Sequence, residues 1–172
     1  MRLLAGNGTG LSLKPFHCLR RHRRIMEEKT IYRYTLQREK VSDVSDSIYM
    51  TDPSRVAEFL RSMGLAQEEQ EHLVVLTLNP KNAVTGYYTV TIGLVNQAQA
   101  AGREIFRKAI IANATGIIMA HNHPSNSCDP STDDVRLTSL MRDAGKIVDI
   151  TLMDHIIVGE RDYFSFREKN IL

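Results

Sequence analysis

The chain has few cysteines, no tryptophan and no long apolar run. Its two cysteines, Cys18 and Cys128, are too few for a disulfide framework, which is the pattern of proteins in a reducing compartment. No stretch approaches the roughly 20 apolar residues of a membrane-spanning helix, and the N-terminus lacks the apolar segment of a signal peptide. We therefore expect a cytoplasmic protein without a membrane span.

A large excess of charge of one sign is also missing. The 172 residues include 22 Lys and Arg against 20 Asp and Glu, a net charge of +2. The excess is concentrated in one basic arm, which contains Arg20, Arg21, Arg23 and Arg24. Without these arginines the chain is slightly acidic, so the arm is the candidate contact with nucleic acid.

Three segments are expected along the chain. Residues 1–25 have no sustained hydrophobic period and predict a basic tail, which is either flexible or, if translation starts at Met26, not part of the native protein. Residues 26–50 are expected to be a connector, with an alternating edge segment at 31–36. Residues 51–172 predict one domain, because the hydrophobic content of 42% is ordinary for a globular protein.

Hydrophobic periodicity predicts alternating helices and strands in this domain. In chain order we expect a helix over 52–63, a hairpin of strands 73–78 and 84–92, a helix over 103–113, a strand from 116 into His121, a helix from Ser131 to a stop at Gly145, and strands over 147–153, 155–158 and 163–166. Apolar residues recur with the expected period in three of these elements. Val84, Tyr88, Val90 and Ile92 share one parity of their strand; Ile105, Phe106, Ala109 and Ile110 form the inner stripe of their helix; Val135, Leu137, Leu140, Met141 and Ala144 recur with helical spacing. The order predicts a mixed α/β fold in which helices flank a mixed sheet.

Residues 115–134 carry the most specific pattern. The consecutive apolar residues that end at Ala120 predict a strand covered on both faces. Side chains two positions apart on a strand share a face, so His121 and His123 can point at one spot while Asn122 points away. This pair of imidazoles predicts a metal site at the end of the strand.

A carboxylate follows in the first turn of the next helix. Asp134 lies three residues after Ser131, close to the end of the histidine strand. Two neutral imidazoles and one carboxylate, with a position left for water, form the ligand set of a catalytic zinc site. Ser131 and Asp134 also fit a simpler interpretation, a helix N-cap with an acid in the first turn.

These residues resemble a known signature. His121, His123, Pro124, Ser131 and Asp134 fit the H-x-H-x7-S-x2-D pattern of the JAMM (JAB1/MPN) metalloprotease family. The resemblance implies its mixed α/β fold, which has a cytidine-deaminase-like architecture.

The surrounding sequence segments resemble the RadC branch of that family over residues 50–172. They are R-E-I-F at 103–106, A-H-N-H-P-S at 120–125 and L-M-D-H-I-I-V-G at 152–159. The chain departs from the usual RadC pattern at Asn126, where Gly is usual, and at Gly102, where Pro is usual. We expect no counterpart of the N-terminal helix-hairpin-helix-type domain of RadC proteins.

The resemblance also implies a zinc-dependent metallohydrolase, a peptidase or isopeptidase acting on a peptide or protein conjugate. One zinc ion would be held by His121, His123 and Asp134. The family places a catalytic glutamate just before the first core strand, where Glu71 stands, and Glu104 in R-E-I-F is the alternative base. Ser131 would hydrogen-bond the developing oxyanion or orient the attacking water.

The same residues exclude two other classes of metal enzyme. The letters H-N-H are not the motif of HNH nucleases, and a zinc deaminase is excluded because H-x-E and P-C-x-x-C are missing. Asp154 and His155 are expected to be structural and not a second metal site. The competing functions are a DNA-repair-associated accessory protein that binds nucleic acid or a partner without hydrolysis, and a scaffold without metal.

Overall fold

The computed structural model describes residue 39 and residues 52–93 and 98–172. The predicted basic tail over 1–25, its four arginines and the edge segment at 31–36 lie outside the described residues. Nucleic-acid binding by that tail therefore stays a prediction, as do the proposed segment boundaries.

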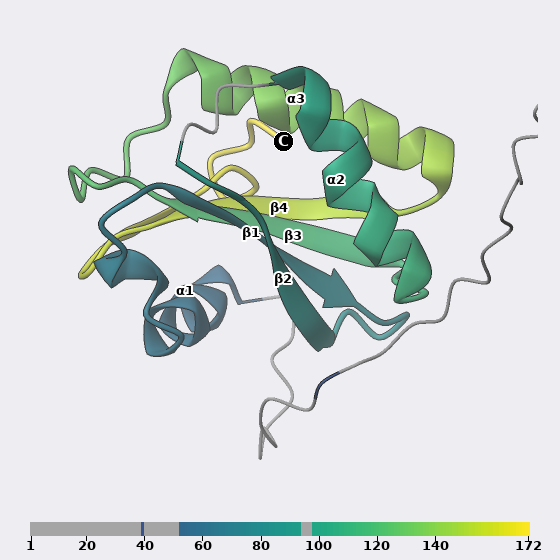
Figure 1. Ribbon diagram of the computed structural model, residues 1–172, viewed down its shortest axis with the longest axis horizontal. Helices are drawn as coiled ribbons and strands as arrows, with labels where there is room; N and C mark the ends of the chain where they lie inside the picture. The colour runs from purple at the N-terminus through teal and green to yellow at the C-terminus, as the bar shows by residue number, and fades with distance from the viewer. Residues whose placement is uncertain (1–38, 40–51, 94–97) are drawn as a thin grey trace, which may run out of the picture. The chain divides into compact units, whose positions relative to one another are not determined.

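The centre of the fold is a mixed sheet of five strands in the order β2-β1-β3-β4-β5 (Figure 1). The strands are β1 (His72–Leu78), β2 (Val84–Ile92), β3 (Gly116–Asn122), β4 (Thr151–Val158) and β5 (Tyr163–Ser165). β1 is antiparallel to both β2 and β3, β3 is parallel to β4, and β4 is antiparallel to β5. The predicted hairpin, the histidine strand and the mixed character of the sheet are confirmed.

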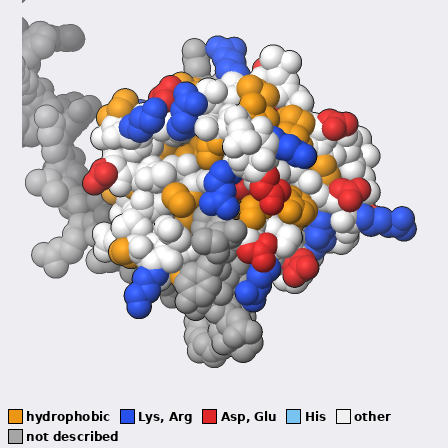
Figure 2. Space-filling view, turned by 180° about the vertical axis from the view of Figure 1, so that it is seen from behind, with side chains coloured by type: hydrophobic (Ala, Val, Ile, Leu, Met, Phe, Trp, Pro, Cys, Tyr) orange, Lys and Arg blue, Asp and Glu red, His pale blue; other side chains and the backbone are white. Residues whose placement is uncertain are grey.

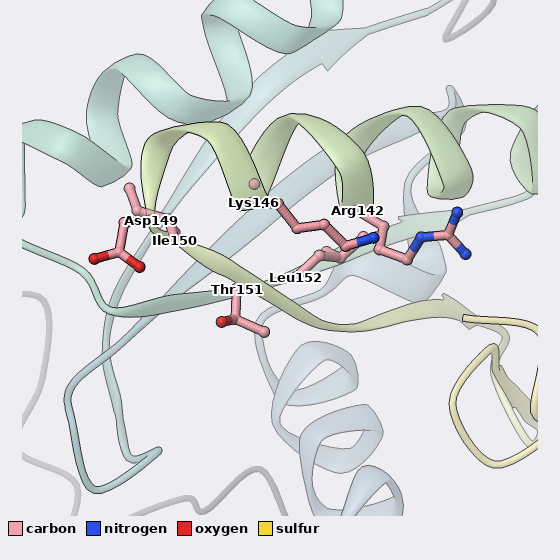
Figure 3. A pocket seen from close by; sticks show the side chains of 7 residues that line it. Arg142, Lys146, Asp149, Ile150, Thr151 and Leu152 are labelled. Atoms are coloured by element: carbon pink, nitrogen blue, oxygen red, sulfur yellow. The ribbon is translucent and has the colours of Figure 1, made fainter.

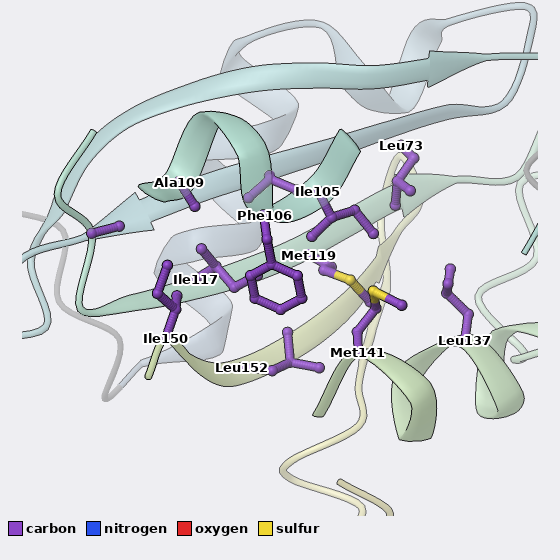
Figure 4. Packing of buried hydrophobic residues seen from close by; sticks show 12 residues of the cluster. Leu73, Ile105, Phe106, Ala109, Ile117, Met119, Leu137, Met141, Ile150 and Leu152 are labelled. Atoms are coloured by element: carbon purple, nitrogen blue, oxygen red, sulfur yellow. The ribbon is translucent and has the colours of Figure 1, made fainter. Parts of the chain in front are cut away.

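Helices cover both faces of the sheet, as predicted. α2 (Ala98–Ile111) and α3 (Thr132–Val148) lie on one face, and α1 (Pro53–Ser62) lies on the other (Figure 1). The core between α2, α3 and the sheet contains Ile105, Phe106, Met119, Met141 and Leu152 (Figure 4). A second core packs α1 and the 3-10 turn η1 (Leu65–Gln67) against the opposite face. β3 contributes side chains to both cores, which explains its unbroken apolar sequence.

The predicted start of the first helix is confirmed. The carboxylate of Asp52 accepts hydrogen bonds from the backbone N–H groups of Ser54 and Arg55, so it satisfies donors that the first helical turn leaves free. Pro53 occupies the first turn, where its missing N–H costs no hydrogen bond.

The predicted stop at Gly145 is wrong, because α3 continues to Val148 and ends at Asp149 with a positive φ of 56°. The glycine serves close packing instead. A Cβ at this position would lie 2.4 Å from the carbonyl oxygen of Ile150. Residues 147 and 148 are therefore helical, and the strands expected at 147–153 and 155–158 form one strand, β4.

The shared face predicted for β2 is also partly wrong. Tyr88 and Val90 pack against the core under α2 and α3, whereas Val84 packs against the core under α1 and Ile92 is exposed. The register of β2 against β1 shifts at both ends of the pair, and each shift reverses the alternation of side chains.

The buried apolar stripes of α2 and α3 contain fewer residues than the sequence pattern suggests. Ile105, Phe106, Ala109, Leu137 and Met141 are buried, but several apolar neighbours at the edges of the stripes are exposed. These exposed residues are Ile110, Val135 and Leu140. One packed face takes only the centre of each stripe, which explains the difference.

Charged side chains of both signs are interspersed with apolar ones on the face seen in Figure 2. Among the helices of the described ranges, none combines the length and apolarity that a bilayer crossing requires.

Candidate metal centre

Two histidine side chains converge where β3 ends. His121 lies in the strand and His123 is the first residue after Asn122, its last residue. Their Nε2 atoms are 3.0 Å apart, as the two-residue spacing predicts. His121 is completely buried because β1 and β4 flank it, while His123 is half-buried at the edge.

The first turn of α3 brings a carboxylate to this pair. Asp134 Oδ1 lies 3.3 Å from His121 Nε2, and Asp134 Oδ2 lies 3.6 Å from His123 Nε2. Burial by itself would raise the pKa of Asp134, but the side chains of His121, His123 and Ser131 around it hold that pKa far below its ordinary value. The carboxylate is therefore ionised and faces both imidazoles.

Ser131 fixes the orientation of this carboxylate. Its hydroxyl donates to Asp134 Oδ2 at 2.6 Å and its backbone N–H donates to the same oxygen at 2.8 Å, while the Asp134 N–H donates back to the hydroxyl. The capping interpretation and the ligand interpretation are thus compatible. The role of Ser131 toward an oxyanion stays a prediction.

Glu71, the residue that precedes β1, brings its carboxylate to the same group. The antiparallel pairing of Leu73 with His121 places the start of β1 beside the end of β3. Glu71 Oε1 lies 3.9 Å from His121 Nε2, and burial raises the pKa of this carboxyl. The alternative base, Glu104, instead forms an ion pair with Arg107 on α2 and is not part of the group.

Asn122 anchors the segment that carries Glu71. Its side chain is buried and points away from the histidines, as predicted, and its Oδ1 accepts from the His72 N–H at 2.8 Å. Its amide group donates to the carbonyl oxygens of Glu68 and Gln70 at 3.1 and 3.0 Å. All these bonds join the residue between the two histidines to the turn around Glu71.

We expect Asn122→Ala to lower the free energy of unfolding by about 1–3 kcal/mol, because the half-buried His72 N–H loses its acceptor, while the two carbonyls belong to exposed residues. Asn122→Asp should be destabilised at least as much, because its buried carboxylate would face the two carbonyl oxygens to which the asparagine amide donates. Urea denaturation measures both variants, and an Asn122→Ala protein as stable as wild type would contradict the anchoring role.

The loop after the histidines is held at several points. His123 Nδ1 is 2.7 Å from the carbonyl oxygen of Ser127, which can only accept, so this nitrogen carries the proton. Asn126 has a positive φ of 59°, a conformation that glycine adopts freely and asparagine tolerates, so the departure from the RadC pattern is compatible with the loop. Its side chain also accepts from the N–H of Glu160 at 2.8 Å.

Four residues can therefore supply ligand atoms to one ion. One atom from each of Glu71, His121, His123 and Asp134 lies within 4.8 Å of the others. Because His123 donates through Nδ1, its Nε2 in the neutral ring is a lone pair directed at His121 Nε2. Two imidazole nitrogens beside carboxylates match a divalent ion that accepts both nitrogen and oxygen ligands, so the donor set fits a metal.

Asp154 and His155, farther along the sequence, have structural contacts. Asp154 is buried and accepts from the N–H groups of His155 and Arg167 and from the Ser165 hydroxyl, which fastens the C-terminal segment to β4. Burial lowers the pKa of His155 well below its ordinary value, so its ring is neutral. Neither residue belongs to the four-residue group.

A separate pocket lies at the opposite end of β4, between the end of α3 and the start of the strand (Figure 3). Its cationic side chains, Arg142 and Lys146, both form ion pairs with Asp143. The pocket contains none of the four candidate ligands.

The geometry defines an α/β domain with a histidine–carboxylate group able to hold a metal ion. The sequence model of the RadC-like JAB domain family matches residues 50–171, and the chain therefore belongs to this family. Relatives include a UPF0758 protein of Chlorobium luteolum, 45% identical over 108 residues, and a UPF0758 protein of Chlorobaculum parvum, 38% identical over 151 residues.

These matches cover 63% and 88% of this chain, respectively. They cover only 48% and 61% of the two relatives, so the chain spans about half the length of the curated relatives it matches.

Proposed function

We propose that this chain is a zinc-dependent hydrolase of amide bonds, a peptidase or isopeptidase that acts on a peptide or protein conjugate. The observation that carries the proposal is the convergence of Glu71, His121, His123 and Asp134 at one end of the sheet. Membership in the JAB family supports the same reaction class.

In this proposal the ion is held by His121 and His123 through Nε2 and by a carboxylate oxygen of Asp134. Zinc favours such mixed nitrogen and oxygen sets, and a catalytic site leaves one position open. When bound, it would supply a Lewis acid that polarises the scissile carbonyl and acidifies water. Ser131 keeps the Asp134 carboxylate in place through two hydrogen bonds.

Glu71 is the proposed proton carrier. Its carboxylate stands beside the histidines, at the partly exposed side of the group where a substrate can enter. As water attacks the carbonyl carbon, Glu71 takes a proton from the water oxygen. It then delivers this proton to the amide nitrogen as the carbon–nitrogen bond breaks, which releases a carboxylic acid and an amine.

Metal analysis of the full chain, purified without chelators, tests the proposal. We expect about one zinc per chain, as a site with three protein ligands requires. Less than about half an equivalent, with no increase when zinc is added, would contradict the proposal and favour the metal-free scaffold instead.

A further inference from the structure

The candidate ligand His121 has a second nitrogen that faces away from the metal group. Its Nδ1 lies 2.9 Å from Nε2 of His155, a residue of the parallel strand β4. Both rings are completely buried. The protonation of His121 is therefore tied to that of His155, because two imidazole nitrogens at hydrogen-bond distance need one donor and one acceptor.

The proton on His155 is placed by Thr138. The Thr138 hydroxyl lies 2.6 Å from the carbonyl oxygen of Asp134, one turn earlier in α3, and a carbonyl can only accept. The single hydroxyl proton is used in this bond. Thr138 Oγ1 is also 2.6 Å from His155 Nδ1, so it must accept there, and Nδ1 carries the proton of the neutral ring.

The proton position on His155 determines the proton position on His121. With its proton on Nδ1, a neutral His155 offers a lone pair at Nε2, and His121 must donate to it through Nδ1. His121 Nε2 then carries a lone pair, as His123 Nε2 does, and two acceptor nitrogens 3.0 Å apart beside the Asp134 carboxylate need a cation between them. The chain of bonds starts at the backbone of one candidate ligand, Asp134, and returns to another, His121.

Packing holds the middle of this chain in place. The ring of His155 stacks on Phe166 with centroids 4.8 Å apart and planes inclined by 16°. The Phe166 N–H donates to the carbonyl oxygen of His155 at 3.0 Å, so strand and ring are held together. A ring fixed in this way keeps Nδ1 toward Thr138 and Nε2 toward His121.

We propose that Thr138 and His155 are positioning residues that keep His121 in the tautomer with its proton on Nδ1, which leaves Nε2 free to bind the metal. Metal-binding histidines commonly donate their other N–H to a carboxylate, carbonyl or water. Here the acceptor is a third imidazole, which needs Thr138 to fix its own tautomer. This positioning role rests on the proposed metal site, and it gives a function to Thr138, which no sequence pattern indicated.

The test compares Thr138→Val with Thr138→Ser in the full chain. Valine keeps the shape of the side chain but removes the oxygen that accepts from His155 Nδ1–H. Its loss favours the opposite tautomer of His155 and therefore of His121. Serine keeps the hydroxyl. Competition with a chromophoric zinc chelator measures the dissociation constant of the protein–zinc complex. We expect it to rise about 10–100-fold in Thr138→Val, the usual effect of losing such a partner, and to stay within about threefold of wild type in Thr138→Ser.

Nitrogen-15 NMR of the histidine rings gives a second readout that a merely structural role would not change. We expect the wild-type protein to carry its His155 proton on Nδ1, with the signals assigned by their loss in His155→Gln. A proton on Nε2 of His155 would overturn the proposal even if Thr138→Val fails to fold. Wild-type protein that binds no zinc would refute the metal site itself, whereas equally tight zinc binding by wild type and Thr138→Val would refute only the positioning role.

Discussion

Glu71→Gln should lower the rate of amide hydrolysis by about 10²- to 10⁴-fold, the usual contribution of general acid–base catalysis. Glutamine keeps the size and a hydrogen-bonding oxygen but cannot take a proton from water. Zinc content should stay at the wild-type level, because Glu71 lies farther from His121 Nε2, at 3.9 Å, than Asp134 does, at 3.3 Å. A base acts on the transition state, whereas a ligand supplies binding energy for the ion.

Turnover is measured on the quenched fluorescent peptides or lysine-linked isopeptides that the wild-type protein cleaves. Glu69→Gln is the matched control, since Glu69 is an exposed acid two residues away. It should hydrolyse the same substrates at the wild-type rate. If Glu71→Gln hydrolyses them at the wild-type rate as well, Glu71 is not the base.

His123→Ala should lose the metal and, with it, all hydrolysis. His123 is the best ligand for this test because it is half-buried and outside the strand, so its removal should leave the fold intact. Asp134 is less suitable, since its side chain also completes the capping box of α3. We expect less than about a tenth of an equivalent of zinc, because two remaining ligands bind it weakly.

His72→Ala serves as the control for removing a histidine nearby. His72 lies at the start of β1 and pairs with Glu68 at 3.8 Å, outside the four-residue group. Its variant should keep a full equivalent of zinc. Circular dichroism verifies that both variants are folded, and a folded His123→Ala protein with wild-type zinc content would exclude this residue as a ligand.

Local rules explain which parts of the site the sequence could predict. Two side chains at i and i+2 on a strand share a face, and a serine with an acid three residues later is a typical signature of a helix N-terminus. His121, His123, Ser131 and Asp134 follow these rules. Glu71 does not, because only the pairing of β1 with β3 brings it to the histidines, and the family resemblance supplied that information.

The errors arise where local patterns meet tertiary packing. Gly145 looks like a helix stop, yet it permits the close approach of the Ile150 carbonyl. Register shifts along β2 reverse the faces of Val84 and Ile92, and periodicity alone cannot locate such shifts. Thr138 and His155 meet only because α3 packs over β4, so no spacing in the sequence indicates their contact.

Crystallography of the zinc-loaded protein, with data on both sides of the zinc absorption edge, tests the metal centre most directly. We expect one anomalous peak about 2.0–2.2 Å from Nε2 of His121, Nε2 of His123 and an oxygen of Asp134, with Glu71 beside the open position. A peak away from these residues, or one in which the Glu71 carboxylate closes that position, would contradict the proposed catalytic site.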